Sequence, residues 1–224
     1  MLAEGTIKRV LAEALAAGGD LAELFVEDRS STGLRLEDRR VEDVASGRDA
    51  GAGVRVVAGE RSSYAYTNLL TEEGLVETAR AARAGLSGDA ASVADLTRTN
   101  PPVEHPVRTP PAEVAAADKV EALRAADDAA RSAGGEVRQV VASYADVRQK
   151  VLIADSDGRL VEDDRTRVRF VCQVVAARDG QISTGFRAPG HSGGFELFDA
   201  FPAAEVGAVA AEKAITMLDA RPSP

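Results

Sequence analysis

Two histidines and one cysteine are the side chains of this sequence best suited to metal or nucleophilic chemistry. A zinc site of the His-Glu-x-x-His type needs two imidazoles one helical turn apart, so that both bind one ion. His105 lies in a proline-rich stretch and His191 in the glycine-rich stretch APGHSGG, and neither belongs to a helical pattern. We interpret both as solvated loop residues, since a lone histidine makes a poor metal site. His191 is the more interesting of the two, because glycines let a ligand approach the backbone closely.

The cysteine, Cys172, lies in the apolar run FVCQVV, which is typical of a buried strand. Reactive thiols need a polar, partly exposed setting, so Cys172 is predicted to be inert. Ser192 follows His191 directly, but adjacency in sequence does not indicate a proton relay, and the G-x-S-x-G motif is absent. The sequence therefore predicts no catalytic, no cofactor-binding and no metal-binding residue in this chain.

Five carboxylates gather around one predicted hairpin: Asp155, Asp157, Glu162, Asp163 and Asp164. A glycosidase holds two carboxylates across a sugar from separate elements, which one hairpin does not provide. A calcium loop would need an oxygen ligand and a glycine where Arg159 and Leu160 stand. We predict that these acidic side chains are solvated at the tip of the hairpin.

Glycine and tyrosine patterns leave one binding hypothesis open. Gly51-Ala52-Gly53 leads into the strand-like run VRVV, so no helix N-terminus follows to hold a phosphate. Tyr64 and Tyr66 alternate with small residues. This alternation is explained either by aromatic packing on one face of a sheet or by a peptide-binding edge.

Composition restricts the possible partners. The 224 residues carry a formal charge of -9, and the isoelectric point is near 4.9. This balance argues against a nucleic-acid partner and against acidic membrane surfaces, because both need a cationic face. No signal peptide and no apolar run of membrane-spanning length is present, so we expect a cytoplasmic protein.

Periodicity predicts the elements of the first half. A helix over about 7–15 ends at Gly18-Gly19, and Thr71 caps a second helix. Strands are expected at about 22–27, 34–44, 53–58 and 61–68. We expect residues 36–68 to form two hairpins joined by a glycine-rich turn at Gly47, Gly51 and Gly53.

The second half repeats this order. Helices are expected at about 113–133 and 204–219, with strands at about 136–146 and 148–155. Asp157-Gly158 and Asp179-Gly180 are strong hairpin signals. We predict an α+β fold of antiparallel hairpins packed with helices, with a two-fold internal repeat of a helix–strands–helix unit. Its expected parts are a first lobe at 1–86, a proline-rich linker at 87–112 and a second lobe at 113–224.

Three stretches carry a resemblance to a known family: LEDRRVEDVASGRDAGAGVRVVAGERSSYAYTN (36–68), the run from 137 to 181, and STGFRAPGHSGGFELF (183–198). They resemble the N-terminal region of the TldD/PmbA family, metallopeptidases also called modulators of DNA gyrase. The form of the first stretch and the LDAR ending favour the TldD type.

The resemblance implies a supporting role for this chain. The family's His-Glu-x-x-x-His zinc site is expected beyond the position of Pro224, so zinc belongs to a C-terminal half that this sequence lacks, and Cys172 is not the family's zinc ligand. It also implies that this N-terminal domain walls a cleft for an unfolded or leader peptide and helps form a homodimer, or a heterodimer with a PmbA/TldE-like subunit. The alternative is a complete, non-enzymatic binding module that pairs with a catalytic partner, and a stand-alone enzyme of another class has the least support.

Overall fold

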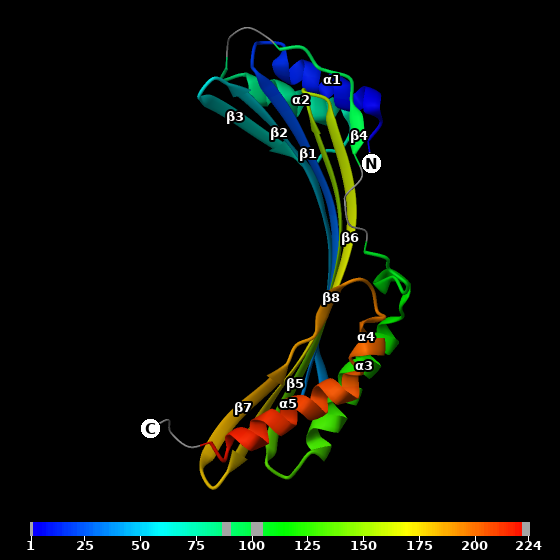
Figure 1. The fold of residues 1–224 in the computed structure, drawn as a ribbon, viewed down its shortest axis with the longest axis vertical. Helices are drawn as coiled ribbons and strands as arrows, with labels where there is room; N and C mark the ends of the chain where they lie inside the picture. Colours follow the sequence, from blue (N-terminus) through cyan, green and yellow to red (C-terminus); the bar gives the residue numbers. More distant parts are fainter. Residues whose placement is uncertain (1, 87–90, 100–104, 221–224) are drawn as a thin grey trace. The chain divides into compact units, whose positions relative to one another are not determined.

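A computed structural model describes residues 2–86, 91–99 and 105–220 (Figure 1). These residues form an α+β fold, as the sequence predicts. Five α-helices pack on an eight-stranded sheet. The helices are α1 (Glu4–Leu15), α2 (Glu72–Arg83), α3 (Ala116–Ser132), α4 (Leu197–Ala200) and α5 (Ala203–Met217). The strands are β1 (Leu21–Glu37), β2 (Arg40–Ala58), β3 (Arg61–Thr67), β4 (Thr97–Thr99), β5 (Val137–Asp155), β6 (Arg159–Arg178), β7 (Gln181–Arg187) and β8 (Gly190–Ser192).

The strand order is β3-β2-β1-β5-β6-β4, and β7 and β8 also pair with β6. The pairs β2/β3, β6/β7 and β6/β8 are antiparallel, whereas the short strand β4 runs parallel to β6. The turn between β6 and β7 is Asp179-Gly180, where φ is 51° and 81°. Both central residues are therefore left-handed, as a tight hairpin turn requires, and this predicted hairpin is confirmed.

The predicted turn at Gly47, Gly51 and Gly53 is wrong, because all three glycines lie inside β2. The chain reverses earlier, at Asp38-Arg39, where φ is 45° and 70°. Two residues without the usual glycine adopt the left-handed conformation there because surrounding contacts hold them. The two hairpins expected over 36–68 are present, with β2 as their shared strand.

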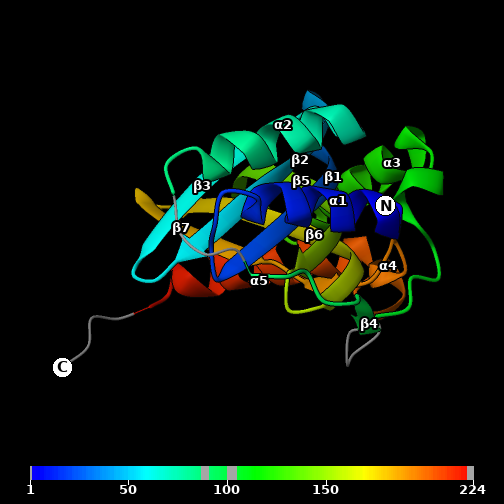
Figure 2. The same ribbon diagram turned by 90° about the horizontal axis from the view of Figure 1, so that it is seen from above.

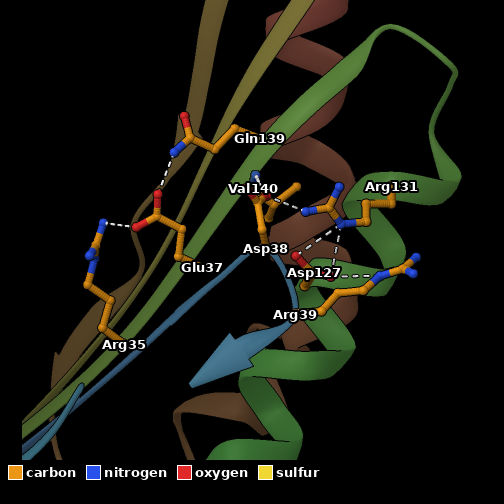
Figure 3. Close-up of polar contacts among 8 residues, drawn as sticks. All are labelled: Arg35, Glu37, Asp38, Arg39, Asp127, Arg131, Gln139 and Val140. Carbon is orange, nitrogen blue, oxygen red and sulfur yellow. Dashed lines mark hydrogen bonds and ion pairs between the residues drawn. The ribbon is translucent and has the colours of Figure 1, made fainter. Parts of the chain in front are cut away.

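Polar contacts fix the Asp38-Arg39 turn against the neighbouring elements (Figure 3). The Asp38 backbone N–H donates to the Val140 carbonyl at 3.1 Å, and the Val140 N–H donates to Asp38 Oδ1 at 3.2 Å. Arg131 of α3 binds Asp38 at 2.5 Å and the buried Asp127 at 3.1 Å. Arg39 lies 3.8 Å from the same Asp127 carboxylate. The conspicuous LEDRR stretch thus anchors a turn to α3 and β5.

The chain forms two compact units. Unit 1 comprises 1–30, 48–104 and 149–164, and unit 2 comprises 31–47, 105–148 and 165–224. They differ from the contiguous lobes expected at 1–86 and 113–224, because β1, β2, β5 and β6 each contribute residues to both units.

In unit 1, α1 and α2 lie side by side against one face of the strands (Figures 1 and 2). Thr71 caps α2 as predicted, accepting a hydrogen bond from the Gly74 N–H at 3.2 Å. Alternate strand residues, including Leu24, Val54 and Leu152, point into the core beneath these helices. The other face of these strands is therefore not covered by α1 or α2.

In unit 2, α3 and α5 pack together over a second core that contains Phe170 and Tyr144. Two glycines make this packing close. A Cβ on Gly207 would come within 2.0 Å of the Ala126 carbonyl oxygen, and one on Gly185 within 2.3 Å of the Ala210 carbonyl oxygen. Glycine at these positions lets α3 and β7 approach the backbone of α5.

The segment expected to be a linker, 87–112, includes 87–90 and 100–104, which lie outside the described residues. Its described part contains β4, so it is not loop throughout. The internal repeat remains a prediction. The element order of each half, one helix followed by two long strands and a seven-residue strand, is compatible with it.

Candidate functional site

Neither histidine joins two other potential metal ligands within the part of the chain that the structure describes. His191 lies in β8, where its Nε2 is 2.8 Å from the Gly194 carbonyl oxygen, so it is half-buried rather than a solvated loop residue. His105 is exposed. Among the described residues no three histidine, cysteine, aspartate or glutamate side chains come together as metal ligands. The described residues therefore do not fit a zinc ion.

Cys172 is buried in the core of unit 2, as predicted. Burial, and to a smaller extent the charge of Asp127, raises the pKa of its thiol to about 12. A thiol with so high a pKa is almost entirely protonated at neutral pH and is a poor nucleophile.

The prediction of a solvated acidic hairpin tip is wrong for Asp155, which is only 2% exposed. Its carboxylate accepts the Arg159 backbone N–H at 3.0 Å and pairs with the Arg159 guanidinium at 3.0 Å. The neighbouring Ser156 is also buried, and its hydroxyl accepts the Ala22 N–H at 3.1 Å. These two side chains fix the β5–β6 turn instead of facing solvent, while Asp157 is exposed.

The glycine-rich stretch around His191 forms a carboxylate-centred turn. Glu196 accepts backbone N–H groups from Gly194 at 2.9 Å, Thr109 at 2.9 Å and Arg108 at 3.2 Å. Partial burial alone would raise the pKa of Glu196, but these backbone hydrogen bonds outweigh it and lower the pKa to about 2. Glu196 therefore holds the chain before α3 against the segment before α4.

The face of unit 1 opposite α1 and α2 is the strongest candidate for a binding site, and we call it the open face. Phe25 of β1 and Tyr64 and Tyr66 of β3 lie on it and are 41%, 60% and 81% exposed. The two tyrosine rings stack with their centroids 6.3 Å apart. Three large aromatic side chains exposed so near one another are unusual on a surface with no partner.

Gly53 of β2 makes room for this arrangement. Gly53 is paired with Tyr66 across the ladder, and Arg55 with Tyr64. A Cβ on Gly53 would come within 2.2 Å of the Tyr64 hydroxyl oxygen, so the Tyr64 side chain lies over the Gly53 backbone. The glycine that the sequence suggested as a turn residue instead accommodates an aromatic ring on the sheet.

These residues line a hollow of about 590 Å³, which we call the aromatic hollow. Its lining consists of Phe25, Glu27, residues 49–53, Tyr64 and residues 66–68. Two carboxylates, those of Glu27 and Asp49, are in the lining, and no lysine, arginine or histidine is among these described residues. The hollow therefore combines aromatic rings, exposed backbone and negative charge.

The hollow lies next to a sheet edge. β3 ends the strand order and pairs only with β2 among the described strands. Proteins usually protect such an edge with proline, lysine or a bulge, because unpaired N–H and C=O groups attract another strand. β3 has seven residues, RSSYAYT, with no proline and no lysine. Its edge is therefore suited to pairing with an added strand.

Sequence reasoning identified Tyr64 and Tyr66 but missed Phe25, Glu27 and Asp49. The alternation LAELFVED did place Phe25 and Glu27 on one face of β1. What no local pattern could supply was the pairing of β1, β2 and β3, which brings 25–27, 49–53 and 64–68 together.

Unit 2 has a similar exposed edge. β7 pairs only with β6 among the described strands. Ile182 and Phe186, on the face of β7 opposite Gly185, are 73% and 64% exposed.

No helix in the described part of the chain is both long and apolar enough to span a membrane.

Comparison with known sequences gives two family matches and several relatives. The PmbA/TldA metallopeptidase domain 1 matches residues 22–85, and the PmbA/TldA metallopeptidase central domain matches residues 109–218. A metalloprotease of Methanothermobacter thermautotrophicus is 29% identical over 206 residues, which cover 92% of this chain and 45% of that protein. A metalloprotease TldD homolog of Haemophilus influenzae is 28% identical over 183 residues, which cover 80% of this chain and 38% of that protein.

Solved structures share the fold. A Thermotoga maritima protein described as a modulator of a DNA gyrase has a TM-score of 0.78 at 17% identity, covering 99% of this chain and 50% of its own. TldE from Thermococcus kodakarensis has a TM-score of 0.66 at 15% identity, covering 95% of this chain and 47% of its own. The chain thus spans less than half the length of the two curated relatives named above.

Proposed function

The chain belongs to the TldD/PmbA family, and on this premise we propose that it is the peptide-binding and dimerisation portion of a TldD-type metallopeptidase. The observation that carries the proposal is the edge of β3 beside the aromatic hollow, with which no other described strand pairs. An extended, unfolded peptide adds to this edge as a further strand, and its side chains rest on Tyr64 and Tyr66.

Strand addition suits the chemistry of this edge. Main-chain hydrogen bonds supply an affinity that does not depend on sequence, while pockets for alternate side chains supply selectivity. Tyr64 and Tyr66 stand two residues apart on one face of β3, which matches the spacing of alternate side chains on an added strand. An unfolded or leader peptide can present such a strand, whereas a folded protein has most of its backbone N–H and C=O groups already paired.

Hydrolysis belongs, in this proposal, to the rest of a longer protein. The relatives are named metalloproteases, and this chain covers 45% and 38% of two of them. Zinc is accordingly proposed to bind outside the residues described here, in a C-terminal half. The contribution of this chain is to capture the peptide and hold it extended.

Dimerisation is proposed to use unit 2. Ile182 and Phe186 expose apolar side chains on β7, a strand that pairs on one side only among the described strands. A second copy, or a PmbA/TldE-like subunit, would cover them. The same surface would serve the alternative function, a non-enzymatic module that pairs with a catalytic partner.

Strand addition is tested with backbone-methylated peptides. We would measure binding of a fluorescein-labelled, uncharged, unstructured decapeptide to the 224-residue chain by anisotropy. Two further peptides carry N-methyl groups at alternate residues, in the two possible registers. In one peptide the N-methyl groups replace the N–H groups that would donate to β3, and this peptide should not bind. In the other peptide the N-methyl groups point away from β3, and binding should be preserved.

Two variants locate the binding edge. Tyr66→Thr should weaken binding of the unmethylated decapeptide, and the matched change Phe186→Thr on β7 should not. Equal binding of both methylated peptides, or a loss of binding with Phe186→Thr alone, would contradict the proposal.

A further inference from the structure

The positive charges of the open face do not neutralise the carboxylates that line the aromatic hollow. On this face, Arg55 donates to Glu23 at 2.5 Å, so these two charges compensate each other. The nearby Arg48 is bound to Asp28 at 2.8 and 2.7 Å. Arg29, further along β1, is not in the lining of the hollow. The nearby cations are therefore either paired or placed outside the hollow.

Two carboxylates in the lining have no cationic partner among the described residues. The Glu27 carboxylate accepts a hydrogen bond from the Gln149 side-chain amide, which is neutral. Asp49 is exposed and makes no hydrogen bond or ion pair within the described part of the chain. The hollow is consequently negative, and the whole chain has a formal charge of -9.

The aromatic rings provide a second attraction for positive charge. The hydroxyl end of the Tyr64 ring lies over Gly53, and the side chain is nevertheless 60% exposed. Tyr66 stacks beside it and is 81% exposed. The exposed face of a tyrosine attracts a guanidinium or ammonium group through its quadrupole. Carboxylates beside stacked tyrosines thus form a site complementary to a cationic side chain.

We propose that the aromatic hollow selects extended peptides by a basic side chain, arginine above lysine, held between the Tyr64–Tyr66 pair and the carboxylates of Glu27 and Asp49. This selectivity rests on the proposed peptide-binding function and specifies its substrate class. Arginine is favoured because its planar guanidinium stacks on an aromatic ring and donates to a carboxylate at the same time. A peptide with an acidic side chain at this position is repelled.

The test compares two peptides that are nearly equal in shape and differ in charge. We would titrate the 224-residue chain with a labelled decapeptide that contains one central arginine, and with the same peptide carrying citrulline there. Citrulline has nearly the shape of arginine but no charge. The arginine peptide should bind about tenfold more tightly, from one cation–π contact and one exposed ion pair. This advantage should shrink as the salt concentration rises.

Charge-removing variants attribute the difference to the hollow. Glu27→Gln combined with Asp49→Asn should bring the two dissociation constants together. Glu60→Gln removes one charge at the exposed β2–β3 turn, outside the lining, and should leave the tenfold ratio unchanged.

The outcomes distinguish the basic selectivity from the strand addition on which it rests. Equal binding of the arginine and citrulline peptides would overturn the basic selectivity and leave strand addition standing. Binding of neither peptide would overturn both. A ratio that survives in the Glu27→Gln, Asp49→Asn variant would show that the selectivity comes from somewhere other than the hollow, and would also overturn this inference.

Discussion

The Tyr64 side chain lies over Gly53, on the neighbouring strand, so closely that a Cβ on Gly53 would stand 2.2 Å from the tyrosine hydroxyl oxygen. This relationship explains why a central strand tolerates a glycine, which offers no side chain to pack. It also explains how a tyrosine that is 60% exposed keeps a defined position next to Tyr66. The aromatic hollow therefore depends on the lack of a side chain at Gly53 as much as on the rings that line it.

Gly53→Ala should therefore alter the hollow more than the fold. The added methyl meets the far end of a flexible side chain rather than backbone, so Tyr64 can swing away. We expect a change in the free energy of unfolding of less than about 1 kcal/mol, because alanine also restricts the unfolded chain. Peptide binding should weaken several-fold by anisotropy. Unchanged binding would show that the position of Tyr64 does not matter.

Gly185→Ala should behave in the opposite way. Its Cβ would meet backbone atoms of α5, the Ala210 oxygen at 2.3 Å and the Ala214 nitrogen at 2.4 Å, and neither can rotate away. Overpacking of this kind costs about 1–3 kcal/mol, which urea unfolding would reveal. Gly135→Ala is the matched control, since nothing lies within 4 Å of its Cβ. A loss of stability in the control as large as in Gly185→Ala would contradict the packing argument.

Arg131→Ala should destabilise unit 2 through Asp127. Asp127 is 1% exposed, and Arg131 is its nearer cationic partner, at 3.1 Å against 3.8 Å for Arg39. Removing one partner of a buried ion pair leaves an uncompensated charge, at a cost of roughly 3 kcal/mol. The comparison is Arg39→Gln, whose guanidinium is exposed and should contribute less than about 1 kcal/mol. Denaturant midpoints that fall equally in both variants would exclude a special role for Arg131.

Glu196 should make stability depend on pH in acid. Its pKa is about 2 in the folded chain, against an ordinary value of 4.5. A carboxyl group whose pKa is lower when folded stabilises the fold above about pH 4.5, and this contribution is lost as the pH falls toward 2. Glu196→Gln should therefore be less stable than the parent chain at pH 7, and the difference should shrink between pH 4.5 and 2.

The measurement for Glu196 is the free energy of unfolding at a series of pH values. Glu212→Gln, a change at an exposed position of α5, serves as the control. Its free energy of unfolding should differ from that of the parent chain by the same amount at every pH. A difference between Glu196→Gln and the parent chain that does not vary with pH would exclude the carboxylate-centred turn as its cause.

Local chemistry in the sequence was enough to predict much of the fold. Helical spacing located α1, α2, α3 and α5. The Asp179-Gly180 signal predicted a real hairpin because its residues suit left-handed turn positions. The Asp38-Arg39 turn escaped prediction, since Arg39 stands where the usual hairpin signal has a glycine. It is stabilised by Val140 and Arg131, which lie about a hundred positions away in sequence.

The candidate site was less predictable for the same reason. The burial of Asp155 follows from its place at the β5–β6 turn beside Arg159, and exposure statistics for aspartate pointed the other way. Tyr64 and Tyr66 were singled out by alternation, but their exposure depends on which face α1 and α2 cover. The negative charge of the hollow depends on Glu27 and Asp49 meeting across paired strands. Strand pairing, rather than local pattern, assembles this site.

Amide hydrogen exchange, observed by nuclear magnetic resonance, tests the central claim most directly, that an extended peptide adds to β3. The 224-residue chain would be labelled with nitrogen-15 and measured with and without the uncharged decapeptide. We predict slower exchange for those backbone amides of Arg61–Thr67 that point away from β2, and shifted resonances along β3, with β7 unchanged. Binding that leaves the β3 amides unaffected, or that protects β7 instead, would contradict the account.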